Sequence, residues 1–186
     1  AAAFQVQGNS TITATGGGNI TLNDTPDFDG AENSFTAVDV LIDADPDALS
    51  LQTVSASGSA TISSVGSLTV KALGSVSTGT SLDMAATGAG EQLLWWGTGT
   101  IGNGLTLTAN DDIDIAGVLT VANGDAVLTS TDDDIDFDEA GSGEAGSLGG
   151  LLSVTNGNAT LDADEEIQGE DLKATVDIEA EVITFE

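Results

Sequence analysis

Short alternating apolar segments that recur at a nearly constant interval constrain the fold of this chain more than any other feature. Pieces of the form Leu-x-Leu, only three to five residues long, occur along most of the sequence, and Gly, Asn, Ser and Asp separate them. Alternation with a period of two is typical of β-strands, and the separators are turn residues. No segment shows an apolar period of 3.6 residues, so the sequence predicts an all-β protein.

The recurrence itself predicts how the strands pair. Ile62 is followed one interval later by Leu82, and the Asn-Gly pair at 103–104 returns after the same interval at 123–124. Strands this short do not make a stable hairpin meander, whereas in stacked coils each strand pairs with its equivalent one coil away, at about 4.8 Å. We therefore expect a right-handed parallel β-helix, or β-solenoid, of about 20 residues per coil, in preference to an antiparallel sandwich. The Asn-Gly pairs, which favour hairpin turns elsewhere, then become corners.

Three segments interrupt the alternation, and we predict them to be loop insertions in a single β-solenoid domain spanning residues 1–186. Residues 23–36 contain a proline, residues 88–99 place four glycines around Leu-Leu-Trp-Trp, and residues 138–150 are rich in glycine. The last segment explains why the third Asn-Gly pair comes only at 156–157, well beyond the interval that separates the first two.

The charge balance excludes several classes of partner and site. The chain has 31 acidic residues against 2 lysines, no His and no Cys, and its formal net charge is −29. Phosphate recognition needs clusters of Lys or Arg, so we expect no nucleic-acid partner. No apolar run is long enough to insert into a membrane. Catalytic triads and zinc sites that need His or Cys are excluded, and we expect no enzyme. Paired carboxylates alone can hydrolyse a glycosidic bond, which leaves a carboxylate-based polysaccharide hydrolase as the weaker alternative.

Residues 103–131 read Asn-Gly-Leu-Thr-Leu-Thr-Ala-Asn-Asp-Asp-Ile-Asp-Ile-Ala-Gly-Val-Leu-Thr-Val-Ala-Asn-Gly-Asp-Ala-Val-Leu-Thr-Ser-Thr. This run resembles the filamentous-haemagglutinin-type repeats of large bacterial surface proteins, clearly over about 100–137 and more weakly over 58–84 and 151–178. The resemblance implies a right-handed parallel β-helix and an adhesin or exoprotein. Ala1-Ala2-Ala3 fits a mature N-terminus left by signal cleavage. We therefore expect a structural or adhesive protein at the cell surface or outside the cell, with a cell-surface or matrix partner.

Self-association is a further expectation. A β-helix has two open ends of unpaired strand edges, which natural solenoids cap or stack upon. Neither end of this sequence carries an amphipathic capping helix, and residues 176–185 favour β-structure. Subunits that stack end to end form an open filament.

Three acidic turns are the candidate metal site. Stacking places equivalent carboxylates above one another, which predicts Asp112 near Asp132 or Asp133, and Asp114 near Asp134. Like charges this close repel by about 1 kcal/mol in water and by more at a protein surface. A bridging Ca²⁺, a retained proton, or salt screening of a solvated acidic face each relieves that repulsion. The candidate calcium ligands are Asp111, Asp112, Asp114, Asp132, Asp133, Asp134, Asp164, Glu165 and Glu166.

Trp95 and Trp96 are the only tryptophans and are the predicted partner contacts. In an alternating strand one of them faces inward and the other outward. An outward tryptophan on a glycine-flanked segment suits contact with a partner. The competing interpretation is that both pack against the solenoid.

Overall fold

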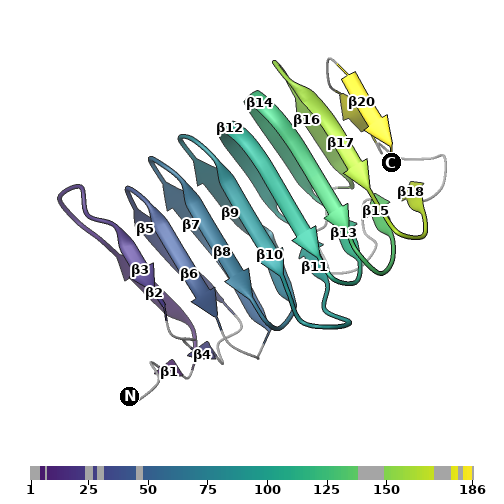
Figure 1. Ribbon diagram of the computed structural model, residues 1–186. Helices are drawn as coiled ribbons and strands as arrows, with labels where there is room; N and C mark the ends of the chain where they lie inside the picture. Colours follow the sequence, from purple (N-terminus) through teal and green to yellow (C-terminus); the bar gives the residue numbers. More distant parts are fainter. Residues whose placement is uncertain are drawn as a thin grey trace.

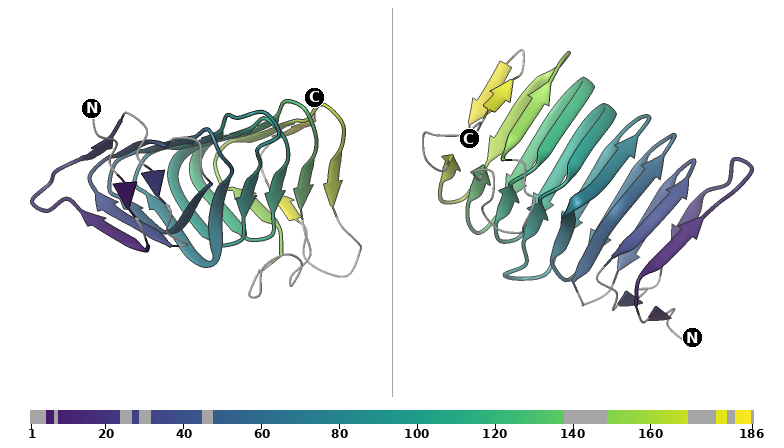
Figure 2. Two further views of the ribbon diagram at one scale, coloured as in Figure 1. Left: turned by 90° about the horizontal axis from the view of Figure 1, so that it is seen from below. Right: turned by 180° about the vertical axis from the view of Figure 1, so that it is seen from behind.

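Parallel β-strands stacked into a solenoid make up the computed structural model, which describes residues 5–6, 8–23, 27–28, 32–44, 48–137, 149–169, 177–179 and 182–185. The fold is all-β, with about six turns of roughly 22 residues each. Figure 1 shows the strands side by side along one long axis, with the chain ends at opposite ends of the stack, and Figure 2 shows the same coils from below and from behind. The prediction of a parallel β-solenoid is confirmed. Within the described part of the chain, no helix has the length and apolarity needed to span a membrane.

The strands fall into three ladders, here called A, B and C, which the chain visits in that order from β7 onward. Two long strands bend at a corner and supply ladders A and B: β7 (Leu49–Ala56) and β9 (Leu68–Thr78). Two others supply ladders B and C: β12 (Thr98–Ala109) and β14 (Val118–Ser130).

The remaining strands each belong to one ladder. Ladder A also contains β11 (Leu93–Trp95), β13 (Ile113–Ile115), β15 (Ile135–Phe137) and β18 (Ile167–Gly169). Ladder B also contains β2 (Ser10–Thr13), β5 (Asn33–Ala37), β16 (Leu151–Val154) and β19 (Asp177–Glu179). Ladder C also contains β3 (Ile20–Leu22), β6 (Val40–Ala44), β8 (Ala60–Ser64), β10 (Leu82–Ala86), β17 (Asn158–Asp162) and β20 (Val182–Phe185). A separate pair joins β1 (Gln5–Val6) to β4 (Asp27–Phe28).

The strand register shows where the expected interval holds. β6 pairs with β8 at that interval, as Val40 with Ala60, but Ile62 pairs with Met84 and not with Leu82, two residues earlier. The additional residues lie at the corner between ladders A and B. Gln52 alone forms this corner in one coil, whereas residues 71–74 form it in the next coil. Coil length therefore varies at the corners, while the strands keep their alternation.

The predicted insertions are only partly loops. β11 pairs with both β9 and β13 inside the expected insertion 88–99, and β12 begins at Thr98, so residues 93–95 and 98–99 are coil strands. The glycine at 97 serves close packing and not a loop, because a Cβ there would collide with the carbonyl oxygen of Gly74. β5 likewise occupies residues 33–36 of the expected insertion 23–36.

The third expected insertion agrees with the register, since Ala126 pairs with Ala159 and not with a residue one ordinary coil later. Most of that insertion, residues 138–148, lies outside the described residues. The Asn-Gly corners stack as predicted: Asn103 pairs with Asn123, whose Oδ1 accepts from Nδ2 of Asn156 at 3.2 Å.

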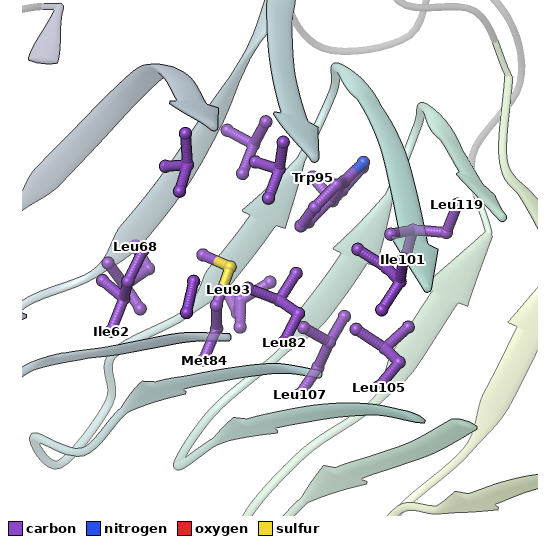
Figure 3. Close-up of a cluster of buried hydrophobic side chains, with 14 of the residues drawn as sticks. Ile62, Leu68, Leu82, Met84, Leu93, Trp95, Ile101, Leu105, Leu107 and Leu119 are labelled. Carbon is purple, nitrogen blue, oxygen red and sulfur yellow. The ribbon is translucent and has the colours of Figure 1, made fainter. Parts of the chain in front are cut away.

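An apolar core fills the solenoid because alternate side chains of every strand point inward. Trp95 is its largest fully buried side chain, and Figure 3 shows its ring near Ile101, in ladder B of the same coil, and near Leu119, in ladder B of the next coil. The Trp95 Nε1 donates to the carbonyl oxygen of Gly97 at 3.2 Å, so the indole is satisfied inside the core. Each fully buried side chain of this kind contributes about 1.5–3 kcal/mol relative to exposure.

Candidate functional site

The acidic turns stack at one corner of the solenoid, where ladder C ends and ladder A begins. We call residues 110–112, 131–134 and 163–166 the acidic corner. Backbone hydrogen bonds continue the ladder through it: the Ile113 N–H donates to the Asp134 carbonyl at 3.1 Å, and the Ile135 N–H donates to the Glu166 carbonyl at 3.0 Å. The backbone ladder therefore brings these like charges together in spite of their mutual repulsion.

Five carboxylates of the acidic corner form two overlapping groups. Oxygens of Asp111, Asp112 and Asp133 lie within 4.8 Å of one another, and so do oxygens of Asp133, Asp134 and Glu165. Asp133 belongs to both groups, which makes one continuous column over three coils. Ca²⁺ takes about six to eight oxygen ligands in flexible geometry, so each group offers part of a calcium coordination shell.

The electrostatic strain of the column is clearest at Asp112. Burial raises the pKa of the Asp112 carboxyl above its usual value of 3.8, and the charges of Asp133, Asp111 and Asp134 raise it further. A hydrogen bond from the Asp134 backbone N–H opposes these effects and lowers that pKa. Together these effects disfavour the ionised form of Asp112. A bound cation would instead favour that form.

Neutral amides already relieve part of this charge. Gln92 Nε2 donates to Oδ2 of Asp112 at 2.5 Å and to Oδ2 of Asp111 at 3.4 Å. At the other end of the column, Gln168 Nε2 donates to Oδ2 of Asp134 at 2.7 Å. The sequence analysis missed both glutamines. Gln92 lay in a segment expected to be an insertion, although its place directly before a buried strand could have revealed it.

The register confirms one predicted pairing and overturns another. Asp112 and Asp133 do come together, as expected. Asp114, however, pairs with Asp136 in ladder A and not with Asp134. The interval grows by one residue at the Asn-Gly corner, where residues 124–125 stand opposite Gly104, and by one more because the turn at 131–134 is one residue longer than the turn at 110–112. Asp136 was missed, although the repeat of Ile-Asp-Ile as Ile-Asp-Phe marks it.

Four predicted ligands lie outside both carboxylate groups: half-buried Asp114, and exposed Asp132, Asp164 and Glu166. The Glu166 backbone N–H donates to Oδ1 of Asp134 at 2.7 Å. Asp164 lines a cavity of about 320 Å³ beside the corner, together with Thr129, Ser130, Thr131, Asp162 and Ala163. A neighbouring hollow of about 210 Å³ shares Thr131.

The tryptophan pair divides between core and surface. Trp95 is 0% exposed, so its predicted role as a partner contact is wrong. Trp96 is half-buried and points away from the core, and its role as a partner contact stays a prediction. The most exposed large apolar side chain among the described residues is Leu73, 84% exposed, at the same corner of the preceding coil.

Comparisons of the chain with protein-family models, with curated proteins and with solved structures find no match. The β-solenoid is therefore shown by the structure itself. The likeness to filamentous-haemagglutinin-type repeats rests on the residues quoted for it and stays a prediction.

Proposed function

We propose that this chain is a non-enzymatic structural protein of the bacterial exterior that stacks end to end through the open edges of its solenoid. The observation that carries this proposal is that, among the described residues, core-type side chains are only half-buried at the N-terminal end of the stack and Phe185 is exposed at the C-terminal end.

At the N-terminal end, the β2 strand pairs only with β5, and β3 only with β6, within the described part of the chain. Ile12 and Leu22 of this first layer are half-buried, whereas Phe35 and Ile42, their partners one coil further, are 0% exposed. Among the described residues, the first layer is thus a core layer that is less covered than the layer after it.

The C-terminal end mirrors this arrangement. Phe185 of β20 is 60% exposed, although its ladder partner Leu161 is 0% exposed. Because every ladder is parallel, the last rung of one copy can continue into the first rung of the next with the same polarity. Such a head-to-tail contact does not close on itself and produces a filament.

Proline at the outer edge of β2 tests this proposal. The Ser10 and Ala14 N–H groups donate to the β5 coil. Neighbouring residues of a strand point their N–H groups to opposite sides, so the Thr11 N–H points to the open edge. Thr11→Pro should therefore reduce assembly without removing an internal ladder hydrogen bond, whereas Thr11→Val keeps the donor and should assemble normally. The readout is the sedimentation coefficient over a range of protein concentrations. A monomer mass that never changes, with calcium or at high salt, would contradict the proposal.

Metal-dependent stiffening is a second candidate function, favoured by the two overlapping carboxylate groups. Calcium held between coils would neutralise the column and lock three successive turns together. Titration calorimetry of the calcium-free protein tests this: Asp133→Asn should weaken binding to both groups, while magnesium at equal ionic strength should compete poorly. Equal heats for the native protein and the variant would reject the site.

Adhesion and surface localisation are the finer parts of the proposal, and they are supported by the resemblance of residues 103–131 to repeats of surface proteins. The hydrolase alternative stays a prediction that a polysaccharide hydrolysis screen tests.

A further inference from the structure

The outward face of ladder B differs from the rest of this acidic molecule. Two side-chain columns run along it, because residues two apart in each strand point to the same side and the strands stack in register. The first column is Thr11, Ser34, Thr53, Ser75, Thr98, Val118 and Leu151. The second column carries a hydroxyl in the first seven of the eight ladder strands: Thr13, Thr36, Ser55, Ser77, Thr100, Thr120 and Ser153. In the eighth strand, β19, Asp177 pairs with Leu151 and Glu179 pairs with Ser153, so the neutral columns end at β16.

Strand geometry makes these hydroxyls a regular grid. They repeat at about 4.8 Å across the strands and at about 6.7 Å along each strand. Eight of the twelve Ser and Thr side chains are exposed and the other four are half-buried. The Thr98 hydroxyl donates to the Gly74 carbonyl at 3.5 Å, which favours one rotamer for this member of the first column.

No Asp or Glu projects from ladder B between Thr11 and Ser153, all of whose ladder residues are described. Ladder C, in contrast, carries exposed Asp43 and Asp83, and ladder A carries the stacked pair Asp114 and Asp136. In a chain of formal net charge −29, a neutral face over seven strands is a strong local departure from the composition.

The chemistry of the face excludes most partners. It has no cation for a polyanion and no aromatic ring on which a sugar could stack. Its apolar members, Val118 and Leu151, are half-buried and confined to one end. Seven strands cover only about 300 Å², against about 800 Å² on each partner in a stable protein complex. A second copy or a globular protein would therefore be held poorly.

We propose that the ladder B face binds ice. A periodic set of hydroxyls can join a hydrogen-bonded network of ordered water, and the threonine methyl groups restrict the orientation of the water beside them. Carboxylates would orient water around their own charge, which explains their absence from the seven strands that carry the columns. The inference depends neither on the stacking of subunits nor on bound calcium.

Partition of the full chain between a slowly growing ice crystal and the remaining liquid tests the proposal, with chelator present throughout. The native protein should be enriched in the ice, and Thr100→Lys, in the middle of the second column, should lose that enrichment. Thr106→Lys is the matched control, because Thr106 is exposed on ladder C in register with Asp83 and should leave the enrichment intact. Ser77→Thr, which adds a methyl group at the same place in the grid, should increase it. Circular dichroism and thermal melts establish that each variant is folded.

Exclusion of the native protein from ice would overturn the proposal, and so would an equal loss in the two lysine variants. If Thr100→Lys does not fold, an unchanged enrichment for Ser77→Thr would count against the proposal. Retention on crystalline cellulose or chitin without enrichment in ice would assign the face to a solid polysaccharide and would also refute ice binding.

Discussion

Replacing Asp133 with Asn removes the carboxylate that the two groups of the acidic corner share. At 4.8 Å, two unit charges repel by about 0.9 kcal/mol in water's dielectric constant. Asp133 has four such neighbours, so full ionisation implies a repulsion of about 3.5 kcal/mol. The unfolded chain keeps part of this repulsion, because some of these residues are adjacent in sequence, and we expect a net gain of about 1–2 kcal/mol for the variant.

This gain should appear in the calcium-free protein at an ionic strength of about 0.01 M, where the Debye length is about 30 Å. For a chain of this size it corresponds to a rise in Tm of about 2–8 °C, measured by circular dichroism. Calcium should reverse the order. At 100 times the Kd the native protein gains about 2.7 kcal/mol, whereas the variant has lost a ligand from both groups.

The decisive result is that the Asp133→Asn variant has the higher Tm without calcium and the native protein has the higher Tm with calcium. Screening by salt cannot reverse this order. Asp83→Asn serves as the matched control, because Asp83 is in register with Thr61 and Thr106 and its replacement removes one charge away from the corner. If calcium raises the Tm of the native protein and of both variants by the same amount, the acidic corner is a solvated face and the calcium reasoning is refuted.

Three other measurements examine the rest of the structure. Trp95→Ala should cost about 3–5 kcal/mol in urea unfolding, and Trp96→Ala clearly less; equal losses would mean that Trp95 is not the core residue described here. Gly117→Ala should lower the free energy of unfolding by about 1–3 kcal/mol, because the added Cβ would collide with the Gly97 carbonyl. An unchanged urea midpoint would show that the backbone at this corner can move to accommodate the methyl group, which would contradict the prediction. In chelator, ionised Asp112 should lower the free energy of unfolding at neutral pH. This destabilisation should shrink as the pH falls toward 3.8, because a raised pKa makes the folded state bind the proton more tightly than the unfolded state does. Asp112→Asn should lack that part of the pH dependence, and an identical pH profile for the variant would contradict the assignment.

The strand pattern was readable from the sequence because it is local. Alternation over a few residues selects strands, and their shortness together with a nearly constant interval selects parallel coils. The same pattern extends through Leu93–Trp95, where flanking glycines suggested a loop. Two of those glycines, Gly88 and Gly97, instead meet the backbone of the neighbouring coil, which is a contact between residues a full turn apart in the sequence.

The acidic corner shows the limit of the same reasoning. Its residue types and its stacking were predictable, and Asp112 does meet Asp133. The pairing of Asp114 with Asp136 was not predictable from a fixed interval, because one extra residue at each of two corners shifts every later side chain. The amide donor Gln92 precedes Asp112 by the ordinary interval, so a fixed interval would have found it, whereas Gln168 follows the coil that contains the insertion.

The sequence by itself thus determined the class of fold, the apolar interior and the excess of negative charge. Only the tertiary structure decided which charges become neighbours and that the first seven strands of ladder B, up to β16, stay free of them. The physical reason is that alternation is a property of each strand, whereas register is the sum of all corner lengths between two strands, and those lengths vary without changing the local pattern.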